Sequence, residues 1–185
     1  MEGTGKPTTL NTRRIVISGV LGAIAILLGW TRIGYIPVPN LAANATIMHV
    51  PVIVGAVMEG WVVGAIIGAV FGLSSFALAT IPLFKNPFIA IVPRIIIGIA
   101  AYFSYAALKK SNEYVALIVA AIVGTLTNTI LVLGLAGLLN YIPWSVMPLI
   151  LITNALPEMI IAVILVVAII TAWKRVEIGS GEAKM

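Results

Sequence analysis

Three ionisable side chains lie inside long apolar stretches of this sequence. Arg94 occurs in the run IVPRIIIG and Glu158 in TNALPEMIIAV. His49, the single histidine, lies in ATIMHVPVIVG. Ionisable groups in apolar segments are costly to bury and commonly face a cavity or a charged partner. These three residues are therefore the first candidates for a binding site.

Asparagines occur at similar positions in the apolar runs and in the loops beside them. An amide both donates and accepts hydrogen bonds, so it suits a polar ligand. The candidate ligand-binding residues are Asn40, Asn44, His49, Asn86, Arg94, Asn128, Asn154 and Glu158.

Each candidate also has a structural interpretation. Arg94 and Glu158 can neutralise one another as an ion pair between two helices. His49 can be an interfacial residue without a ligand. The asparagines can join helices through hydrogen bonds worth about 1 kcal/mol each. The similar depth of these residues is what favours a shared pocket.

The residue types give little support to catalysis. The chain has no cysteine and no aspartate, so it offers no paired carboxylates and no thiolate ligands. One histidine does not make a metal site, and we expect no metal and no cofactor. No glycine-rich phosphate loop of the GxxxxGK[ST] kind is present. We expect a protein that is not an enzyme and does not hydrolyse ATP by itself.

The composition is that of an integral membrane protein. Hydrophobic residues make up 61% of the 185 residues and charged residues only 9%, with a mean hydropathy of +1.16. A soluble domain carries about 25% charged residues. The net charge of +5 comes from short basic clusters at the ends of apolar runs, so it indicates membrane orientation and no nucleic acid.

Six apolar runs predict an all-α bundle of six transmembrane helices. They are Ile15 to Trp30, Ile47 to Met58, Trp61 to Ile81, Phe88 to Leu108, Tyr114 to Leu139, and Leu149 to Trp173. In the third run, glycines recur at every fourth residue from Gly60 to Gly72, which favours close helix packing. Residues 1–12 are expected to form a disordered tail, 13–174 the membrane domain, and 175–185 a second tail.

The basic residues orient this bundle. One side would carry Lys109 and Lys110 with the basic residues near both termini, whereas the other side would carry only Arg32 and Lys85. The positive-inside rule then places both termini in the cytoplasm. The polar, proline-containing stretch from Pro37 to Gly55 would begin on the outer side, as a lid over a small molecule.

Four blocks together resemble a known family. ATIMHVPVIVGAVMEGWVVGAIIGAVFGLSSF, IVPRIIIG, GTLTNTILVLG and TNALPEMIIAV are similar, in order and spacing, to the substrate-binding S components of energy-coupling factor (ECF) vitamin transporters. The resemblance implies capture of a vitamin outside a prokaryotic plasma membrane. It also implies partnership with a coupling membrane subunit and a pair of ATP-binding-cassette ATPases. Gly19 and Ala23 would be the small residues that meet the coupling subunit.

The vitamin is less defined than the family. The HVPVIVGA, VPRI, LTNT and PE blocks are most similar to pantothenate-type S components, and Arg94 suits a carboxylate. Riboflavin is the alternative, because apolar walls, asparagines and aromatic residues would suit a flavin. A stand-alone small carrier or a structural membrane subunit remains a third hypothesis.

Overall fold

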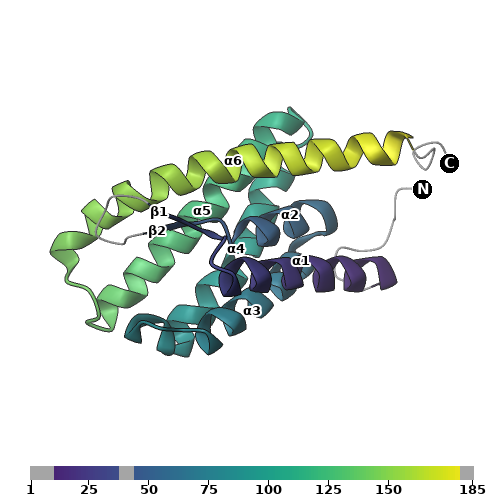
Figure 1. The fold of residues 1–185 in the computed structure, drawn as a ribbon. Coiled ribbons are helices and arrows are strands. Elements are labelled where there is room, and N and C mark those ends of the chain that lie inside the picture. The colour runs from purple at the N-terminus through teal and green to yellow at the C-terminus, as the bar shows by residue number, and fades with distance from the viewer. Residues whose placement is uncertain (1–10, 38–43, 180–185) are drawn as a thin grey trace.

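The computed structural model describes residues 11–37 and 44–179. Over these residues the chain forms six α-helices, a two-stranded antiparallel hairpin and two short 3-10 helices (Figure 1). Their order is α1 (Thr12–Trp30), β1 (Tyr35–Pro37), β2 (Asn44–Thr46), α2 (Val50–Glu59), α3 (Trp61–Ala77), η1 (Pro82–Lys85), α4 (Pro87–Leu108), α5 (Glu113–Leu138), η2 (Trp144–Val146) and α6 (Met147–Gly179).

The helices differ in whether they are long enough to cross a membrane. Helices α1, α4 and α5 and the segment that contains α6 are long and apolar enough to do so. Helix α2 has 10 residues and α3 has 17. At about 1.5 Å per residue, α2 is only about 15 Å long, half of a hydrocarbon core of about 30 Å. The prediction of a helical membrane protein is thus supported by four candidate spans.

Helix α2 forms the centre of the bundle. Its residues are buried almost without exception, and it contacts α1, α3, α4, α5 and α6. A short helix that is apolar on all sides can be accommodated only inside such a ring of helices. Helix α1 covers this core with one face, which includes Gly22 and Ala25, and exposes the other.

Glycines bring α3 and α4 into close contact. A Cβ added to Gly68 would lie 2.1 Å from the carbonyl oxygen of Arg94. One added to Gly72 would lie 2.8 Å from the Cα of Ile91, and Gly98 on α4 meets Gly64 in the same way. The glycine repeat therefore lets the backbones of α3 and α4 pack closely, as its spacing predicts. It also places the backbone of Arg94 directly opposite Gly68.

Helices α2 and α3 are joined by one residue, Gly60. Its φ of 104° lies in a region that favours glycine. Next to it, the buried carboxylate of Glu59 forms ion pairs with Arg13, at 2.9 Å, and Arg14, at 3.6 Å. This junction therefore lies beside the N-terminal end of α1.

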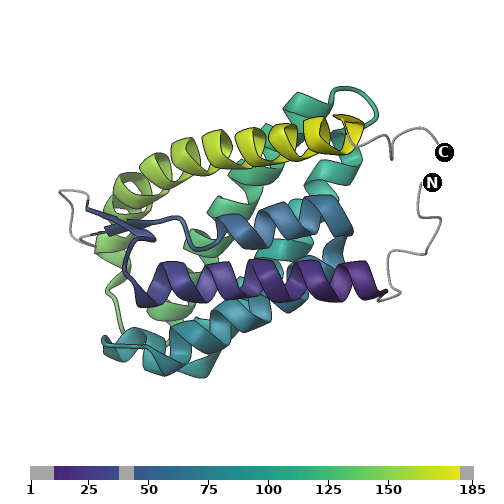
Figure 2. The same ribbon diagram turned by 45° about the vertical axis from the view of Figure 1, so that its right-hand side comes forward.

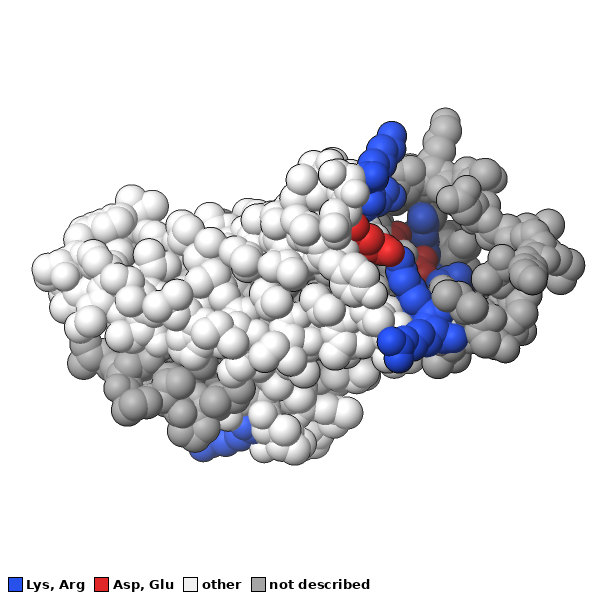
Figure 3. Space-filling view, turned by 90° about the horizontal axis from the view of Figure 1, so that it is seen from above, with Lys and Arg blue, Asp and Glu red and all other residues white. Residues whose placement is uncertain are grey.

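The connections alternate between two ends of the bundle. The hairpin, η1 and the α5–α6 connection lie at one end, and the α4–α5 turn lies at the other, with the beginning of α1 and the end of α6 (Figures 1 and 2). Figure 3 shows most of the visible basic and acidic side chains gathered at that second end. The described basic residues there are Arg13, Arg14, Lys109, Lys110, Lys174 and Arg175.

Several boundaries differ from those expected from the apolar runs. Thr12 already belongs to α1, because Asn11 caps the helix by accepting from the N–H of Arg14. Helix α2 begins only at Val50, and Pro51 lies in its first turn, where the missing N–H of proline is not needed. Helix α6 continues past Lys174 to Gly179, because lysine and arginine favour helices. The hairpin was not predicted, because strands of three residues leave no periodic pattern.

Candidate ligand-binding site

His49 is fully buried immediately before α2, where the chain enters the bundle. Its Nε2 lies 2.9 Å from the hydroxyl oxygen of Thr125 on α5. That hydroxyl donates to the carbonyl of Ala121, so it accepts from an Nε2–H. In the neutral imidazole this assignment leaves Nδ1 as an acceptor, and Nδ1 has no partner.

Arg94 is buried on α4 with its side chain folded along its own helix. Its Nη1 donates to the carbonyl of Ile89 at 2.7 Å. The guanidinium carbon lies 4.8 Å from the ring centre of Phe84 in η1 and 5.5 Å from that of Phe71 on α3. Both rings provide cation–π attraction, which is strengthened away from water. The buried Nε has no hydrogen-bond partner.

The position of Arg94 follows from the proline before it. In a regular helix the N–H of residue 93 would donate to the carbonyl of Ile89, but Pro93 has no N–H. An unpaired buried carbonyl is costly, and the Nη1 of Arg94 satisfies it instead. The Pro–Arg pair thus creates an acceptor and supplies its donor, which holds the guanidinium in place.

Glu158 connects α6 to the hairpin. Its side chain is 4% exposed, and its Oε1 accepts from the N–H of Thr46 at 2.8 Å and from the Thr46 hydroxyl at 3.3 Å. Thr46 is the last residue of β2. The carboxylate therefore fastens one strand of the hairpin to the helix bundle.

Asn128 adds another polar group from α5. It lies one turn after Thr125 and is 9% exposed, and its side-chain oxygen has no partner. Thr129 on the same helix is buried and donates to the carbonyl of Thr125. Helix α5 therefore presents an amide and two hydroxyls within little more than one turn.

Arg94 and Glu158 do not form the ion pair that was the alternative interpretation. Among the carboxylates whose side chains the structure describes, none lies within ion-pair distance of the Arg94 guanidinium. Glu158 contacts the hairpin, whereas Arg94 contacts a carbonyl and aromatic rings. The guanidinium charge is therefore buried without a direct ion pair.

The remaining asparagines have different positions. Asn86 caps α4 by accepting from the N–H of Phe88 at 3.0 Å, a structural role that the sequence analysis did not give it. Asn154 is half-buried on α6, one turn before Glu158, and has an interaction partner. Asn44 pairs with Pro37 in the hairpin ladder. Asn40 lies outside the described residues.

Sequence reasoning missed several members of this site. The polar contacts of Thr46, Thr125 and Thr129 were not predicted, and Phe71 was not considered as a partner of Arg94. The GTLTNT block contained a usable signal, since Thr125 shares a helix face with Asn128 and Thr129, which lie three and four positions further on. The pairing with Phe71 depends on the α3–α4 approach and has no local signal.

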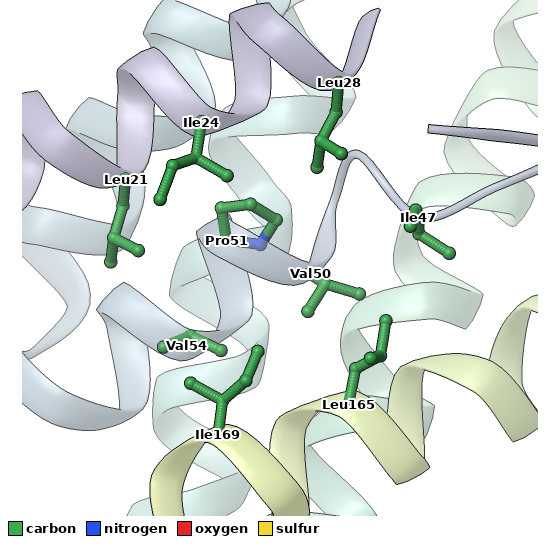
Figure 4. A pocket seen from close by; sticks show the side chains of 9 residues that line it. All are labelled: Leu21, Ile24, Leu28, Ile47, Val50, Pro51, Val54, Leu165 and Ile169. Carbon is green, nitrogen blue, oxygen red and sulfur yellow. The ribbon is translucent and has the colours of Figure 1, made fainter. Parts of the chain in front are cut away.

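A separate groove lies between α1, α2 and α6 (Figure 4). Apolar residues line it, including Leu21 and Ile24 from α1, Pro51 and Val54 from α2, and Ile169 from α6. None of the polar candidates lines this groove. It therefore offers no partner for a charged or hydrogen-bonding ligand, and we do not assign the ligand to it.

Gly19 and Ala23 lie on the exposed face of α1. A Cβ added to Gly19 would meet nothing within 4 Å. Around these small residues, α1 exposes Ile15, Val16, Val20 and Leu27. This face is therefore open to a partner or to lipid.

The comparison with known proteins identifies the class. Residues 13–170 match the family described as the substrate-specific component of ECF transporters, and the chain belongs to this family. It is therefore a transporter subunit and not an enzyme. Over 155 residues it is 41% identical to the pantothenic acid transporter PanT of Lactococcus lactis subsp. cremoris (strain MG1363). The match covers 70% of this chain and 78% of that relative.

Proposed function

We propose that this S component captures pantothenate, with Arg94 binding the substrate carboxylate. One observation carries this proposal: the guanidinium is buried, held by the carbonyl of Ile89, and forms no direct ion pair with a described carboxylate. Burying a charge without a counter-ion is costly. A carboxylate ligand would supply the missing charge and a charge-assisted hydrogen bond to the free Nε.

The other groups of the site match the rest of the molecule. Pantothenate carries hydroxyl groups and an amide in addition to its carboxylate. The free Nδ1 of His49 accepts from a hydroxyl, and the amide of Asn128 can both donate and accept. Similarity to a pantothenic acid transporter supports the same substrate.

The two aromatic rings beside Arg94 favour pantothenate over riboflavin. A flavin ring needs an aromatic face on which to stack. Phe71 and Phe84 already lie against the Arg94 guanidinium. These two rings are therefore not free to stack on a flavin. The binding test below includes riboflavin as the alternative substrate.

The proposed orientation places both termini in the cytoplasm of a prokaryotic cell, with the membrane domain at residues 13–174. The basic residues at the end that holds the beginning of α1 and the end of α6 support it by the positive-inside rule. The hairpin end, with Glu158 and Arg94 beneath it, then faces outwards and admits the vitamin. The residues beyond 174 and before 13 would lie on the cytoplasmic side.

Transport needs partners that supply energy. The proposed partners are a coupling membrane subunit and a pair of ATP-binding-cassette ATPases, as the family implies. The open face around Gly19 and Ala23 on α1 would meet the coupling subunit, because small residues let helices approach closely.

Calorimetric titration of the purified protein tests the substrate. We expect tight binding of pantothenate, much weaker binding of the analogue in which an alcohol replaces the carboxylate, and no binding of riboflavin. Arg94→Ala should weaken pantothenate binding and abolish the preference for the acid over the alcohol. Lys85→Ala is the matched control, since it removes an exposed positive charge at the same end.

The outcomes separate the hypotheses. An unchanged preference for the acid in Arg94→Ala would refute the role of Arg94. Binding of riboflavin, visible as yellow protein after purification, would refute the substrate. Failure to co-purify with the coupling subunit and ATPases on co-expression would refute the proposed partnership.

A further inference from the structure

A second groove lies at the end of the bundle that holds the beginning of α1, between the first turns of α5 and the last turns of α6. It is lined by Glu113, Tyr114, Leu117, Thr171, Lys174 and Arg175. It is far along both helices from the hairpin end, where Glu158 contacts β2. The candidate vitamin-binding residues do not line it.

The polar side of this groove is organised. The carboxylate of Glu113 accepts from the hydroxyl of Tyr105 at 3.0 Å and also from the ammonium of Lys174. These contacts connect α4, α5 and α6 and hold Lys174 at the rim. Lys174 nevertheless stays 44% exposed, so its ammonium can contact a further group.

Among the described side chains around the groove, positive charge exceeds negative charge. Lys174 and Arg175 line it, while Lys109 lies 5.9 Å from the ring centre of Tyr105, the residue that contacts Glu113. Glu113 is the one carboxylate among the lining residues, and it is shared with Lys174. The rim therefore attracts an anion.

The floor and the surface beyond it are apolar. Leu117 lies one turn below Glu113 on α5, and Tyr114 beside it is 60% exposed. Further along the same helix, Val115 and Ile118 are also exposed. A ligand held at the rim would thus have an apolar helix surface running from it into the membrane.

From the positive rim and the apolar path, we infer that this groove binds an anionic phospholipid. Its phosphodiester lies between Lys174 and Arg175, and one acyl chain follows the exposed side chains of Tyr114 and Ile118. Basic pockets between membrane helices on the cytoplasmic side are suited to such headgroups. A free phosphate would use the rim but leave the apolar floor uncovered, so the lipid matches more of the site.

Titration of the detergent-solubilised protein with single lipids, followed by native mass spectrometry, tests this inference. We expect phosphatidylglycerol to bind at least several-fold more tightly than phosphatidylcholine. Arg175→Gln should weaken phosphatidylglycerol binding about fivefold, and the added Lys174→Gln should weaken it by about the same factor again. Lys85→Gln, which removes a charge at the opposite end, should leave it unchanged.

Arg175→Gln leaves the Glu113–Lys174 contact in place, so it tests the site without disturbing the fold. Equal binding of the two lipids, or equal affinity of Arg175→Gln and the unsubstituted protein, would overturn the inference. Displacement of phosphatidylglycerol by inorganic phosphate or by glycerophosphoglycerol at comparable concentration would show a soluble-anion site and overturn the lipid assignment.

Discussion

The backbone N–H of Thr46 donates a hydrogen bond of 2.8 Å to the carboxylate of Glu158, across 112 positions of the chain. The Thr46 hydroxyl lies 3.3 Å from the same oxygen. This contact connects the hairpin between α1 and α2 to the middle of α6. In the proposed function, it ties the lid to a helix of the binding site.

Removing this contact should speed ligand release. Glu158→Ala leaves the N–H of Thr46 without its charged acceptor, and a hydrogen bond to a charged group contributes about 1.5–3 kcal/mol. We expect pantothenate to dissociate roughly tenfold to hundredfold faster, as measured by chasing bound labelled vitamin with unlabelled vitamin. Glu158→Gln keeps an oxygen acceptor, so its dissociation rate should lie between those of the unsubstituted protein and of Glu158→Ala. An unchanged dissociation rate in Glu158→Ala would mean that this contact does not hold the lid.

Replacing Pro93 should make the protein more stable and at the same time weaken pantothenate binding. Pro93→Ala restores an N–H that can donate to the carbonyl of Ile89 and so competes with Arg94 for this acceptor. An interior proline costs a helix about 3 kcal/mol, so we expect a higher melting temperature in detergent. Pantothenate binding should weaken about tenfold, because the guanidinium loses a fixed contact worth about 1.5 kcal/mol.

Pro87→Ala is the matched control for this experiment. Pro87 occupies the first turn of α4, where a missing N–H costs nothing. Neither the melting temperature nor the affinity should change much. If Pro93→Ala binds pantothenate as tightly as the unsubstituted protein, the Ile89 carbonyl does not position Arg94.

The Arg94 environment shows how far sequence reasoning reaches. The proline marks a carbonyl four residues earlier, that of Ile89, which lacks its usual helical donor. That the Arg94 side chain supplies the donor, across five positions, is seen only in the structure. The contact with Phe84 has no local signal either, because it depends on how η1 folds over α4. Nor could Glu158 be matched to Thr46, since their approach depends on the whole bundle.

Asn86 shows a local signal that was overlooked. An asparagine followed by a proline at the start of an apolar run is the usual sequence signal of a helix N-cap. Here Asn86 caps α4, yet it was assigned to the ligand because of its depth alone. Local capping rules were thus the better guide at this position. His49, Arg94 and Glu158 were chosen for the same reason, a similar depth along the helices, and all three are buried in the bundle.

The glycine repeat leads to a stability prediction. Gly68→Ala would place a methyl group 2.1 Å from the backbone oxygen of Arg94, so α3 and α4 must separate. We expect a loss of about 1–3 kcal/mol in unfolding free energy, seen as a lower melting temperature in detergent. Gly134→Ala on α5 is the control, because a Cβ there meets nothing within 4 Å. Equal melting temperatures for both variants would contradict the close helix approach.

The exposed face of α1 leads to a prediction about transport. Gly19→Leu adds a large side chain where α1 has no neighbour within the described chain, so folding and pantothenate binding should be unchanged. If this face meets the coupling subunit, the same substitution should stop uptake by cells that express the complete transporter. Gly134→Leu adds the same side chain at an equally open position on α5 and should leave uptake near normal. Weakened pantothenate binding in Gly19→Leu, equal to its loss of uptake, would show that the coupling face and the binding site are not separate.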